Sequence, residues 1–477
     1  MIDTSRATTA TALAAALLLG GCSFIPTYER PAAPVPATFA GAGVNAGAAE
    51  PAASAAPWQD YFAEPRLRQL IETALANNRD LRIAALNIDQ ARATFQVRRA
   101  DLYPGVGLAA NASRAPAAGS GDLTNSFSVG LAVSAWEIDF FGRIASLKEQ
   151  ALAQYLATEE GRNAAQVSLV AAVANGWLNL LADEELLELS RQTLASREES
   201  VRLTKMRLDS GVASELDFRQ AESLAHAARA TLAQQQRQRA LDENALALLL
   251  GQPLPEDIRG SLAGSRLGAA PVMAPLPAGL PSQLLTRRPD IRQAEQQLIA
   301  SNANIGAARA AFFPRISLTA QAGTASGELS GLFKNGSWGF TIAPSLLLPI
   351  FDAGRNQANL ESAQAGRSIA VAQYEKAIQT AFREVSDALA GQATLGEQAQ
   401  AQQQQAQAES ARLQLADLRY RNGVASYLDL LDAQRSLFAA QQAVVQVQLA
   451  RLQNQVALYK ALGGGAGNPA AAADTPS

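Results

Sequence analysis

Apolar residues recur every seven positions along a long stretch in the first half of the chain. The repeating positions are Val173, Leu180, Leu187, Leu194, Val201 and Leu208, with Val170 and Trp177 between them. In a helix of 3.6 residues per turn, a sustained seven-residue repeat predicts left-handed supercoiling against a neighbouring helix. A plain core stripe in a globular bundle is the alternative. The same spacing recurs near the C-terminal end, at Val445, Leu449, Leu452, Val456 and Tyr459.

The segments that carry these repeats contain no Pro. Pro is absent from residues 142–252 and 350–468, and each range is broken only by a Gly-containing turn, at Ser210-Gly211 and at Asn422-Gly423. Such runs predict helical hairpins. A first limb over residues 143–208 would be about 100 Å long. A compact domain does not accommodate helices of that length, so we expect extended coiled coils.

Four shorter segments alternate apolar and polar residues with a period of two. Phe127 and Val129 alternate with small polar residues in the first half, and Trp338 and Phe340 do so in the second. This period gives a strand one apolar and one polar face. We expect strands at about 103–114, 126–138, 314–325 and 337–350. These lengths suit tilted strands that cross a membrane, for which about 9–11 residues suffice.

Four strands cannot close a transmembrane barrel by themselves. In lipid every backbone N–H and C=O must be bonded, and the smallest spanning barrels have about eight strands. If the segments span a membrane, several copies of the chain must share one barrel, with its Ser, Gly and Thr face lining water. The alternative is a soluble β-hairpin in each half that packs one face on a core.

The chain is an internal duplication. An offset of 210 aligns residues 79–104 with 289–314, and an offset of 212 aligns the Gly-Val-Ala-Ser turn at Gly211 with that at Gly423. We expect repeat 1 at 61–267 and repeat 2 at 268–465. Each repeat should hold a helical stretch (67–100 and 282–311), two strands and a long helical hairpin (142–251 and 354–462).

The N-terminus has the features of a lipoprotein leader. Residues 10–19 are almost wholly apolar but too short to span a bilayer. They end in Leu19-Gly20-Gly21-Cys22, which resembles the bacterial lipobox, and Ser23 in place of Asp favours sorting to the outer membrane. We expect a signal peptide at 1–21, a lipidated Pro/Ala-rich strap at 22–60 and a disordered tail at 466–477. An ordinary leader that contains a Cys by chance is the alternative.

Composition excludes several classes of protein. The net charge is -3, with 40 Lys+Arg against 43 Asp+Glu, so the chain lacks the bulk positive field of a nucleic-acid binder. One Cys and one His cannot form an internal disulfide or a zinc site of several Cys and His ligands. We find no nucleophile-base pair, metal cluster or nucleotide loop, so we expect no enzyme and no cofactor other than a covalent lipid on Cys22.

Together these motifs resemble the TolC-like outer-membrane efflux channels, in the lipoprotein (OprM-like) branch that serves resistance-nodulation-division pumps. The resemblance covers nearly all of the mature chain. It rests on the duplicated element order and on five motifs: Cys22, Pro26-x-Tyr28-x-Arg30-Pro31, Phe351-Asp352-x-Gly354-Arg355, the two Gly-Val-Ala-Ser turns and Tyr427-Leu428-Asp429-Leu430-Leu431-Asp432-Ala433-Gln434.

The resemblance implies a mostly α-helical, internally duplicated protomer with transmembrane β-structure. Each protomer would give four strands to a trimeric 12-stranded barrel that a long α-helical coiled-coil barrel continues into the periplasm. It implies a homotrimer in the outer membrane, bound through a periplasmic adaptor (membrane fusion) protein to an inner-membrane resistance-nodulation-division pump. The expected function is a passive exit duct for drugs and other small molecules in a tripartite efflux system, with palmitate as one lipid on Cys22.

The resemblance also assigns sites. The periplasmic tip would contact the adaptor through Gly211, Val212, Ser214, Gly423, Val424 and Ser426. Gly permits the positive φ of a tight turn, and the two Ser residues can cap the returning helices. Leu413, Asp417 and Arg419 are the candidates for an aperture gate, in which a ring of carboxylates attracts cations or pairs with Arg. Arg419 has a counterpart in Arg207, so capping of a helix end is its alternative role.

Two other functions fit the sequence. The duct could export heavy-metal ions, although three Met and one His offer few soft ligands. The chain could also be a lipid-anchored coiled-coil scaffold or adaptor of the cell envelope, in which the four alternating segments are soluble.

Overall fold

The computed structural model describes residues 23–36, 39, 57–116, 121, 123–267 and 287–464. The predicted signal peptide, Cys22 and the tail from residue 466 lie outside these residues. The chain divides into two compact units. Unit 1 comprises Met1–Ala33, Leu86–Glu159 and Gln293–Lys376, and unit 2 comprises Pro34–Ala85, Glu160–Arg292 and Ala377–Ser477. Both repeats contribute segments to both units, as a duplicated protomer requires.

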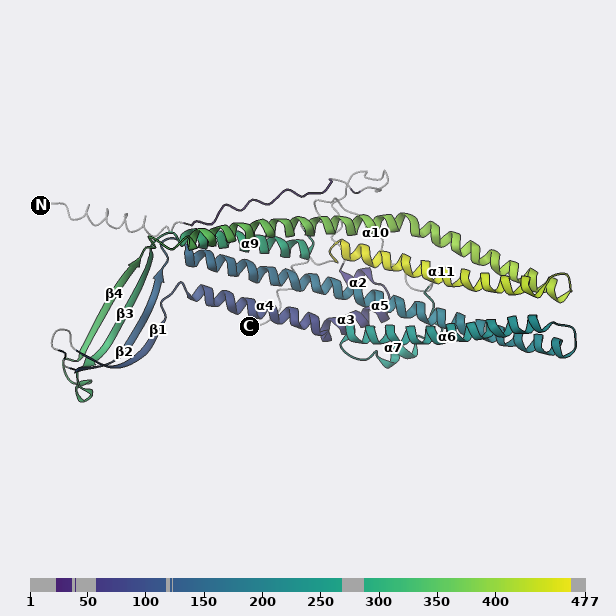
Figure 1. Cartoon of the computed structure of the whole chain (residues 1–477), viewed down its shortest axis with the longest axis horizontal. Helices are drawn as coiled ribbons and strands as arrows, with labels where there is room; N and C mark the ends of the chain where they lie inside the picture. Colours follow the sequence, from purple (N-terminus) through teal and green to yellow (C-terminus); the bar gives the residue numbers. More distant parts are fainter. Residues whose placement is uncertain are drawn as a thin grey trace. The chain divides into compact units, whose positions relative to one another are not determined.

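The described residues of unit 1 form a four-stranded antiparallel sheet in the order β1-β2-β3-β4 (Figure 1). Its strands are β1 (Val106–Pro116), β2 (Leu123–Ile138), β3 (Arg315–Ser326) and β4 (Trp338–Leu347), and a short 3-10 turn, η2 (Leu329–Gly331), lies between β3 and β4. These strands lie within a few residues of the predicted ranges. Leu108 pairs with Leu131 and Ala320 with Ile342. All of β4 and nearly all of β1 are exposed.

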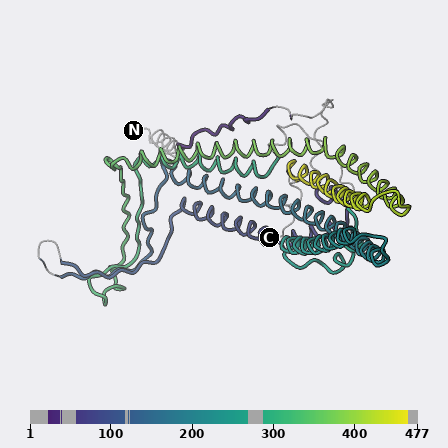
Figure 2. The backbone as a smooth tube through the Cα atoms, turned by 45° about the vertical axis from the view of Figure 1, so that its right-hand side comes forward, coloured from purple at the N-terminus to yellow at the C-terminus, as the bar shows by residue number. Residues whose placement is uncertain are grey.

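Four helices accompany the sheet in unit 1. They are the later part of α4 (Arg79–Ala100), the start of α5 (Arg143–Asp209), most of α9 (Pro289–Ala310) and the start of α10 (Arg355–Arg421). Figures 1 and 2 agree that these segments lie side by side in the order α10, α9, α5, α4. Each helix of this layer is joined to the sheet: α4 precedes β1, α5 follows β2, α9 precedes β3 and α10 follows β4.

The predicted helical stretch at 67–100 is present, with one break. It consists of α3 (Pro65–Asn77) and α4, which are separated at Asn78. The side chain of Asn78 accepts a hydrogen bond from Leu81 N (2.9 Å) and therefore caps α4. It also donates to Leu249 O (2.9 Å), so the break is held by a helix from far along the chain.

Unit 2 is built on the two predicted hairpins, α5 with α6 (Glu215–Leu250) and α10 with α11 (Tyr427–Ala461). Short helices α2 (Trp58–Tyr61), α3 and α7 (Glu256–Gly260) pack against them. The core contains Val173, Trp177, Leu180, Val456 and Tyr459, all at positions of the two heptad seams. An apolar stretch of α5 is long enough to cross a bilayer, but it is mostly buried, as in a core helix.

Candidate functional site

The two hairpin turns at the ends of the long helices have the same backbone geometry. Gly211 and Gly423 both have positive φ, 74° and 71°. Val212 N donates to Arg207 O (2.8 Å), and Val424 N donates to Arg419 O (2.9 Å). Such hydrogen bonds are typical of helices that end just before a residue with the left-handed backbone conformation. Gly is therefore required at both turns, because it adopts positive φ without strain.

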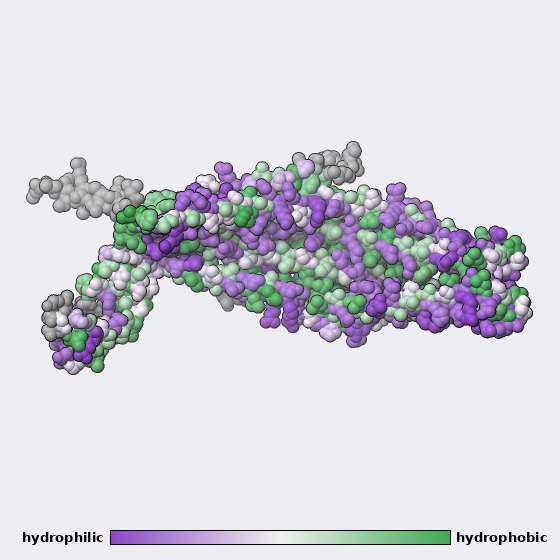
Figure 3. Space-filling view, in the orientation of Figure 1, coloured by the Kyte–Doolittle hydropathy of each residue, from purple (hydrophilic) through white to green (hydrophobic). Residues whose placement is uncertain are grey.

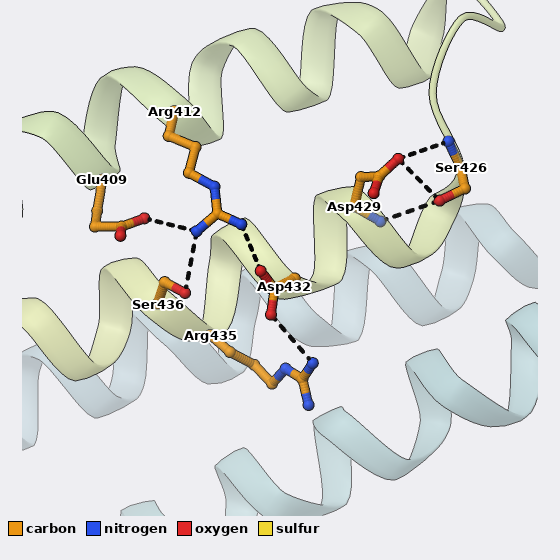
Figure 4. Close-up of polar contacts among 7 residues, drawn as sticks. All are labelled: Glu409, Arg412, Ser426, Asp429, Asp432, Arg435 and Ser436. Atoms are coloured by element: carbon orange, nitrogen blue, oxygen red, sulfur yellow. Dashed lines mark hydrogen bonds and ion pairs between the residues drawn. The ribbon is translucent and has the colours of Figure 1, made fainter.

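Each returning helix begins with a capping box. Ser426 Oγ accepts from Asp429 N (3.2 Å), and the Asp429 carboxylate accepts from Ser426 N (3.1 Å), as Figure 4 shows. Ser214 and Asp217 repeat the arrangement at 3.1 and 3.2 Å. The predicted caps are thus present, and they fix the turns at an exposed end of each hairpin.

The turns expose apolar side chains. Val212 is 68% exposed and Val424 67%, and Leu216 and Leu428 are exposed just beyond them. Green apolar surface lies among purple polar surface at the hairpin ends in Figure 3. An exposed apolar patch with a polar rim is typical of a protein-binding surface.

A charged network lies behind the second turn. Arg412 on α10 donates to Asp432 on α11, to Glu409 (3.2 Å) and to Ser436 (3.3 Å), and Arg435 donates to Asp432 (3.4 Å). Figure 4 shows this network bridging the two limbs of the hairpin. Sequence reasoning selected the segment that contains Asp432 as a motif but missed Arg412.

The three gate candidates lie on α10 but do not form one cluster. Asp417 forms its ion pair with Arg421, four residues later (2.9 Å), and not with Arg419. Leu413 packs on the small core around Tyr427 and Leu430. The i, i+4 spacing of Asp417 and Arg421 was the signal that could have identified the pair.

The α5/α6 hairpin contacts α10 near the gate candidates. The guanidinium of Arg207 on α5 lies 4.8 Å from the ring centre of Tyr420. A cavity of about 900 Å³ lies beside this contact and is lined by residues of α5, α10 and α11, among them Leu413, Asp417 and Tyr427. The two hairpins also pack here through a small apolar cluster, in which Ala221 of the first hairpin lies with Tyr427 and Leu430 of the second.

An acidic pair, a buried Asp183 and a half-buried Asp242, lies farther along the α5/α6 hairpin. Asp183 is only 6% exposed, and one of its carboxylate oxygens has no hydrogen-bond partner among the described residues. Burial, together with the nearby carboxyl group of Asp242, raises the pKa of Asp183 to about 8. Sequence reasoning missed this pair, because the two residues are 59 positions apart in the chain.

The strap docks on α9 in unit 1. Arg30 makes two hydrogen bonds to Glu295 (2.7 and 2.9 Å), and Tyr28 makes a third (3.0 Å). Burial and the Glu295 charge raise the pKa of Tyr28. Gly306 allows close approach, because a Cβ there would lie 2.6 Å from the Ile25 side chain. The motif residues 24–30 therefore hold the segment that follows Cys22.

Charged groups lie at the end of the sheet where β2 ends and β3 begins. Glu137 at the end of β2 accepts from Arg143 (2.6 Å) and Arg315 (2.9 Å). Asp352 caps α10 by accepting from Gly354 N (3.0 Å) and Asn356 N (2.9 Å), and these bonds lower the pKa of Asp352. The Phe-Asp-x-Gly-Arg motif thus forms a strand-to-helix junction.

No group of three or more His, Cys, Asp and Glu side chains arranged to hold a metal ion occurs among the residues that the structure describes. His226 and the Gln-rich segment at 398–407 lie on helices α6 and α10.

Comparison with known proteins identifies the family. The family model described as "Outer membrane efflux protein" matches residues 70–252 and 280–464. The toluene efflux pump outer membrane protein TtgC and the antibiotic efflux pump outer membrane protein ArpC, both of Pseudomonas putida, are each 47% identical over 460 residues, which cover 94% of both chains. The MtrE outer membrane channel of Neisseria gonorrhoeae aligns with a TM-score of 0.83 at 42% identity and covers 93% of this chain and 99% of MtrE.

These similarities confirm the predicted fold class, a mostly α-helical, internally duplicated protomer that contributes four strands to a shared transmembrane barrel. They also confirm the predicted location, because the relatives are outer-membrane proteins. The family is one of channels and not of enzymes. The chain therefore belongs to the outer membrane efflux protein family and is the outer-membrane channel component of an efflux system, extending from the outer membrane into the periplasm.

Proposed function

We propose that three copies of the chain form a passive exit duct for drugs and other small apolar or amphipathic molecules. The sheet carries this proposal. Its two outer strands, β1 and β4, each have one unpaired edge among the described residues, and unpaired backbone groups are not tolerated in hydrocarbon. Three copies of a four-stranded sheet give a closed barrel of twelve strands, with an even number as in known single-chain barrels.

The two faces of the strands suit such a barrel. Trp338, Phe340 and Ile342 of β4 are exposed large apolar residues on one face, and the residues between them are Gly339 and Thr341. The first face fits lipid, and the second fits a water-filled lumen. The visible surface of the sheet in Figure 3 is mostly pale to green, as expected for a surface that meets lipid.

The hairpin turns would bind a periplasmic adaptor protein, and through it an inner-membrane resistance-nodulation-division pump that supplies the energy. The contact residues would be Gly211, Val212, Ser214, Gly423, Val424 and Ser426. The exposure of Val212 and Val424, on turns that are rigidly capped, supports this role. Replacing both Val residues with Asp should abolish efflux and adaptor binding but leave channel assembly intact.

The tunnel end would be gated near Leu413, Asp417 and Arg419. The contact between Arg207 of α5 and Tyr420 joins α10 to the other hairpin, and the Asp417–Arg421 pair, which lies within α10, orients the charged side chains of the candidate gate. Breaking both, with Asp417→Asn and Tyr420→Ala, should increase single-channel conductance in a planar bilayer. An unchanged conductance would place the gate elsewhere.

Cys22 would carry a covalent lipid that anchors the mature N-terminus in the outer membrane. The docked strap supports this role, because Phe24, two residues after Cys22, stacks on Phe313 at 4.6 Å. Phe313 lies just before the start of β3. Mass spectrometry of the mature N-terminal peptide should find an acylated Cys22, and Cys22→Ser should abolish the added mass.

Efflux and conductance test the proposal together. In a strain whose own efflux channel has been deleted, expression of this chain with a matching adaptor and pump should restore resistance to toluene and to antibiotics, the cargoes after which its relatives are named. The purified protein should form pores in a planar bilayer. Protein that assembles but never conducts, even with Asp417→Asn and Tyr420→Ala, would refute the duct.

A further inference from the structure

We propose that Arg197 on α5 is the centre of a buried binding site for a small inorganic anion of the size of chloride, held between α5 and α11. The inference does not depend on the proposed duct, because every residue that carries it lies in unit 2. The bound ion would tie the two helical hairpins together near their turns, since each hairpin supplies groups that bind it.

Arg197 is a buried cation without a counter-charge. It is 5% exposed, and its Nη1 atom has no hydrogen-bond partner. Among the described residues it forms no ion pair. The next residue, Glu198, is paired with Arg229 (2.7 Å), and Glu199 is paired with Arg202 (2.6 Å). A buried charge that lacks a partner is costly, so this position favours an anion that the chain itself does not supply.

A second buried arginine in the same unit provides the comparison. Arg288 is 4% exposed and therefore as buried as Arg197. It donates to Asp290 (2.7 Å), to Glu384 (2.7 Å) and to the carbonyl oxygen of Ala461 (3.0 Å). The chain thus supplies two carboxylates to one buried guanidinium and none to the other.

Arg197 occupies a core position of the α5 seam. Ser190, Arg197 and Thr204 follow one another at intervals of seven residues and are 1%, 5% and 3% exposed. The apolar heptad residues of this stretch, Leu194 and Val201, are only partly buried. The most buried line of α5 is therefore polar here, and a side chain at position 197 faces a neighbouring helix instead of solvent.

The facing helix is α11, which runs antiparallel to α5. Asn179 accepts a hydrogen bond from Gln453 (2.7 Å), and Thr204 lies beside Tyr427. Between these two contacts α5 advances by 25 residues and α11 goes back by 26. The register is therefore constant along this stretch.

Hydrogen-bond donors surround Arg197. The register places it opposite Gln434 and Arg435, and Arg435 and Tyr427 are the titratable groups close enough to act on it. Arg435 already has a carboxylate partner in Asp432 (3.4 Å). The Tyr427 hydroxyl is buried and forms no hydrogen bond of normal geometry among the described residues. Burial raises the pKa of Tyr427, so this phenol stays neutral and can donate to an anion.

Gln434 completes the donor set. Its side-chain oxygen is buried and has no hydrogen-bond partner among the described residues. The two ends of an amide group have nearly the same shape, so a half-turn directs the NH2 group toward an anion instead. Gln434, Tyr427 and Thr204 also line the cavity of about 900 Å³ beside Tyr420. An ion can therefore reach this layer through the cavity.

The site suits a small, spherical anion. Because only 5% of the Arg197 surface is accessible, a chloride ion fits beside it more readily than a phosphate or a carboxylate with its attached group. A guanidinium, a phenol and an amide approach the same point from two helices, and a spherical ion accepts hydrogen bonds from all of these directions.

Unfolding at different chloride concentrations tests the site. The purified full chain in detergent is unfolded with urea at constant ionic strength while chloride replaces gluconate. An ion that binds only the folded state increases the ratio of folded to unfolded protein about 100-fold when its concentration is about 100 times its dissociation constant. The natural protein should therefore gain stability with chloride, and Arg197→Met and Arg197→Gln should not. In gluconate, Arg197→Met should be at least as stable as the natural protein, because it removes an unpaired buried charge.

Arg288→Met is the matched control. It removes an equally buried guanidinium that has carboxylate partners of its own. This variant should lose stability in both salts and keep the gain with chloride. An absence of gain in the natural protein, or a gain that persists in both Arg197 variants, would overturn the site.

A crystal of the natural protein soaked in bromide locates the ion without any substitution. The anomalous signal of bromide should lie within hydrogen-bonding distance of the Arg197 guanidinium and should be absent from Arg197→Met. A water molecule beside Arg197 in place of bromide, or a carboxylate of another protein chain, would overturn the proposal.

Discussion

Gly130 on β2 and Gly323 on β3 face each other in the register of the sheet, and their backbones are in close approach. A Cβ added to Gly130 would lie 2.4 Å from Ala322 O and 2.7 Å from Gly323 Cα. Cβ atoms essentially never come closer than 3.0 Å to such atoms. Gly130→Ala should therefore force β2 and β3 apart and weaken the sheet on which the barrel depends.

The size of the effect follows from the distances. The strands must separate by at least 0.6 Å, the difference between 3.0 and 2.4 Å. Hydrogen bonds of about 2.9 Å would lengthen to about 3.5 Å, the limit for a useful bond. Two weakened bonds at about 1 kcal/mol each, or an overpacking cost of about 1–3 kcal/mol, give a loss of about 2 kcal/mol for each chain.

The assay is urea unfolding of the protein in lipid vesicles, followed by gel mobility and tryptophan fluorescence. Gly339→Ala is the matched control, because a Cβ there has nothing within 4 Å; it should change stability by less than about 0.5 kcal/mol. The double change of Gly130 and Gly323 to Ala should cost less than the sum of the single changes, since both require the same separation of strands.

Two results would refute this reasoning. If Gly130→Ala were as stable as the natural protein, the close approach of β2 and β3 would not exist in the membrane. If Gly339→Ala were equally harmful, the loss would come from a general intolerance of side chains on that face and not from the β2–β3 contact.

Three further predictions concern the helices and the strap. Ser426→Ala should cost about 1 kcal/mol and accelerate amide hydrogen exchange at the start of α11, whereas Ala425→Ser should not; unchanged exchange would mean that the capping box does not hold the turn. Because the pKa of Asp183 is raised to about 8 in the folded state, the folded state binds more protons between about pH 4 and 8, so stability should fall as pH rises through this range. Asp183→Asn should reduce the difference between the unfolding temperatures measured at pH 6 and at pH 9. An unchanged difference would count against the pair. Gly306→Val should displace the strap from α9 and speed proteolysis of residues 23–36, while Gln96→Val, at the equivalent position of α4, should not; equal protection of both variants would contradict the docking.

Much of the fold could be predicted from local pattern. The heptad positions Val173 and Leu180 are fully buried, because a seven-residue repeat shows directly which face of a helix must be covered. The segments that alternate apolar and polar residues predicted the strands, because this alternation does not depend on distant residues. The Gly and Ser residues of the turns gave the caps for the same reason: all of their partners lie within three or four positions.

Other features depended on contacts that a sequence does not display. The break at Asn78 needs Leu249 O, 171 residues away, and the raised pKa of Asp183 needs Asp242. The docking of the strap on Glu295 and Gly306 was missed because each of those residues is unremarkable in its own helix. The Asp417–Arg421 pair is different: it is local and could have been identified.

The proposed duct depends on completion of the free edges of β1 and β4 by other copies of the chain. Native mass spectrometry of the protein released from detergent micelles tests it most directly. The released protein should have the mass of three mature chains, with no smaller species that retains the sheet. A folded single chain that is stable in water without detergent, with its strands protected from hydrogen exchange, would contradict it.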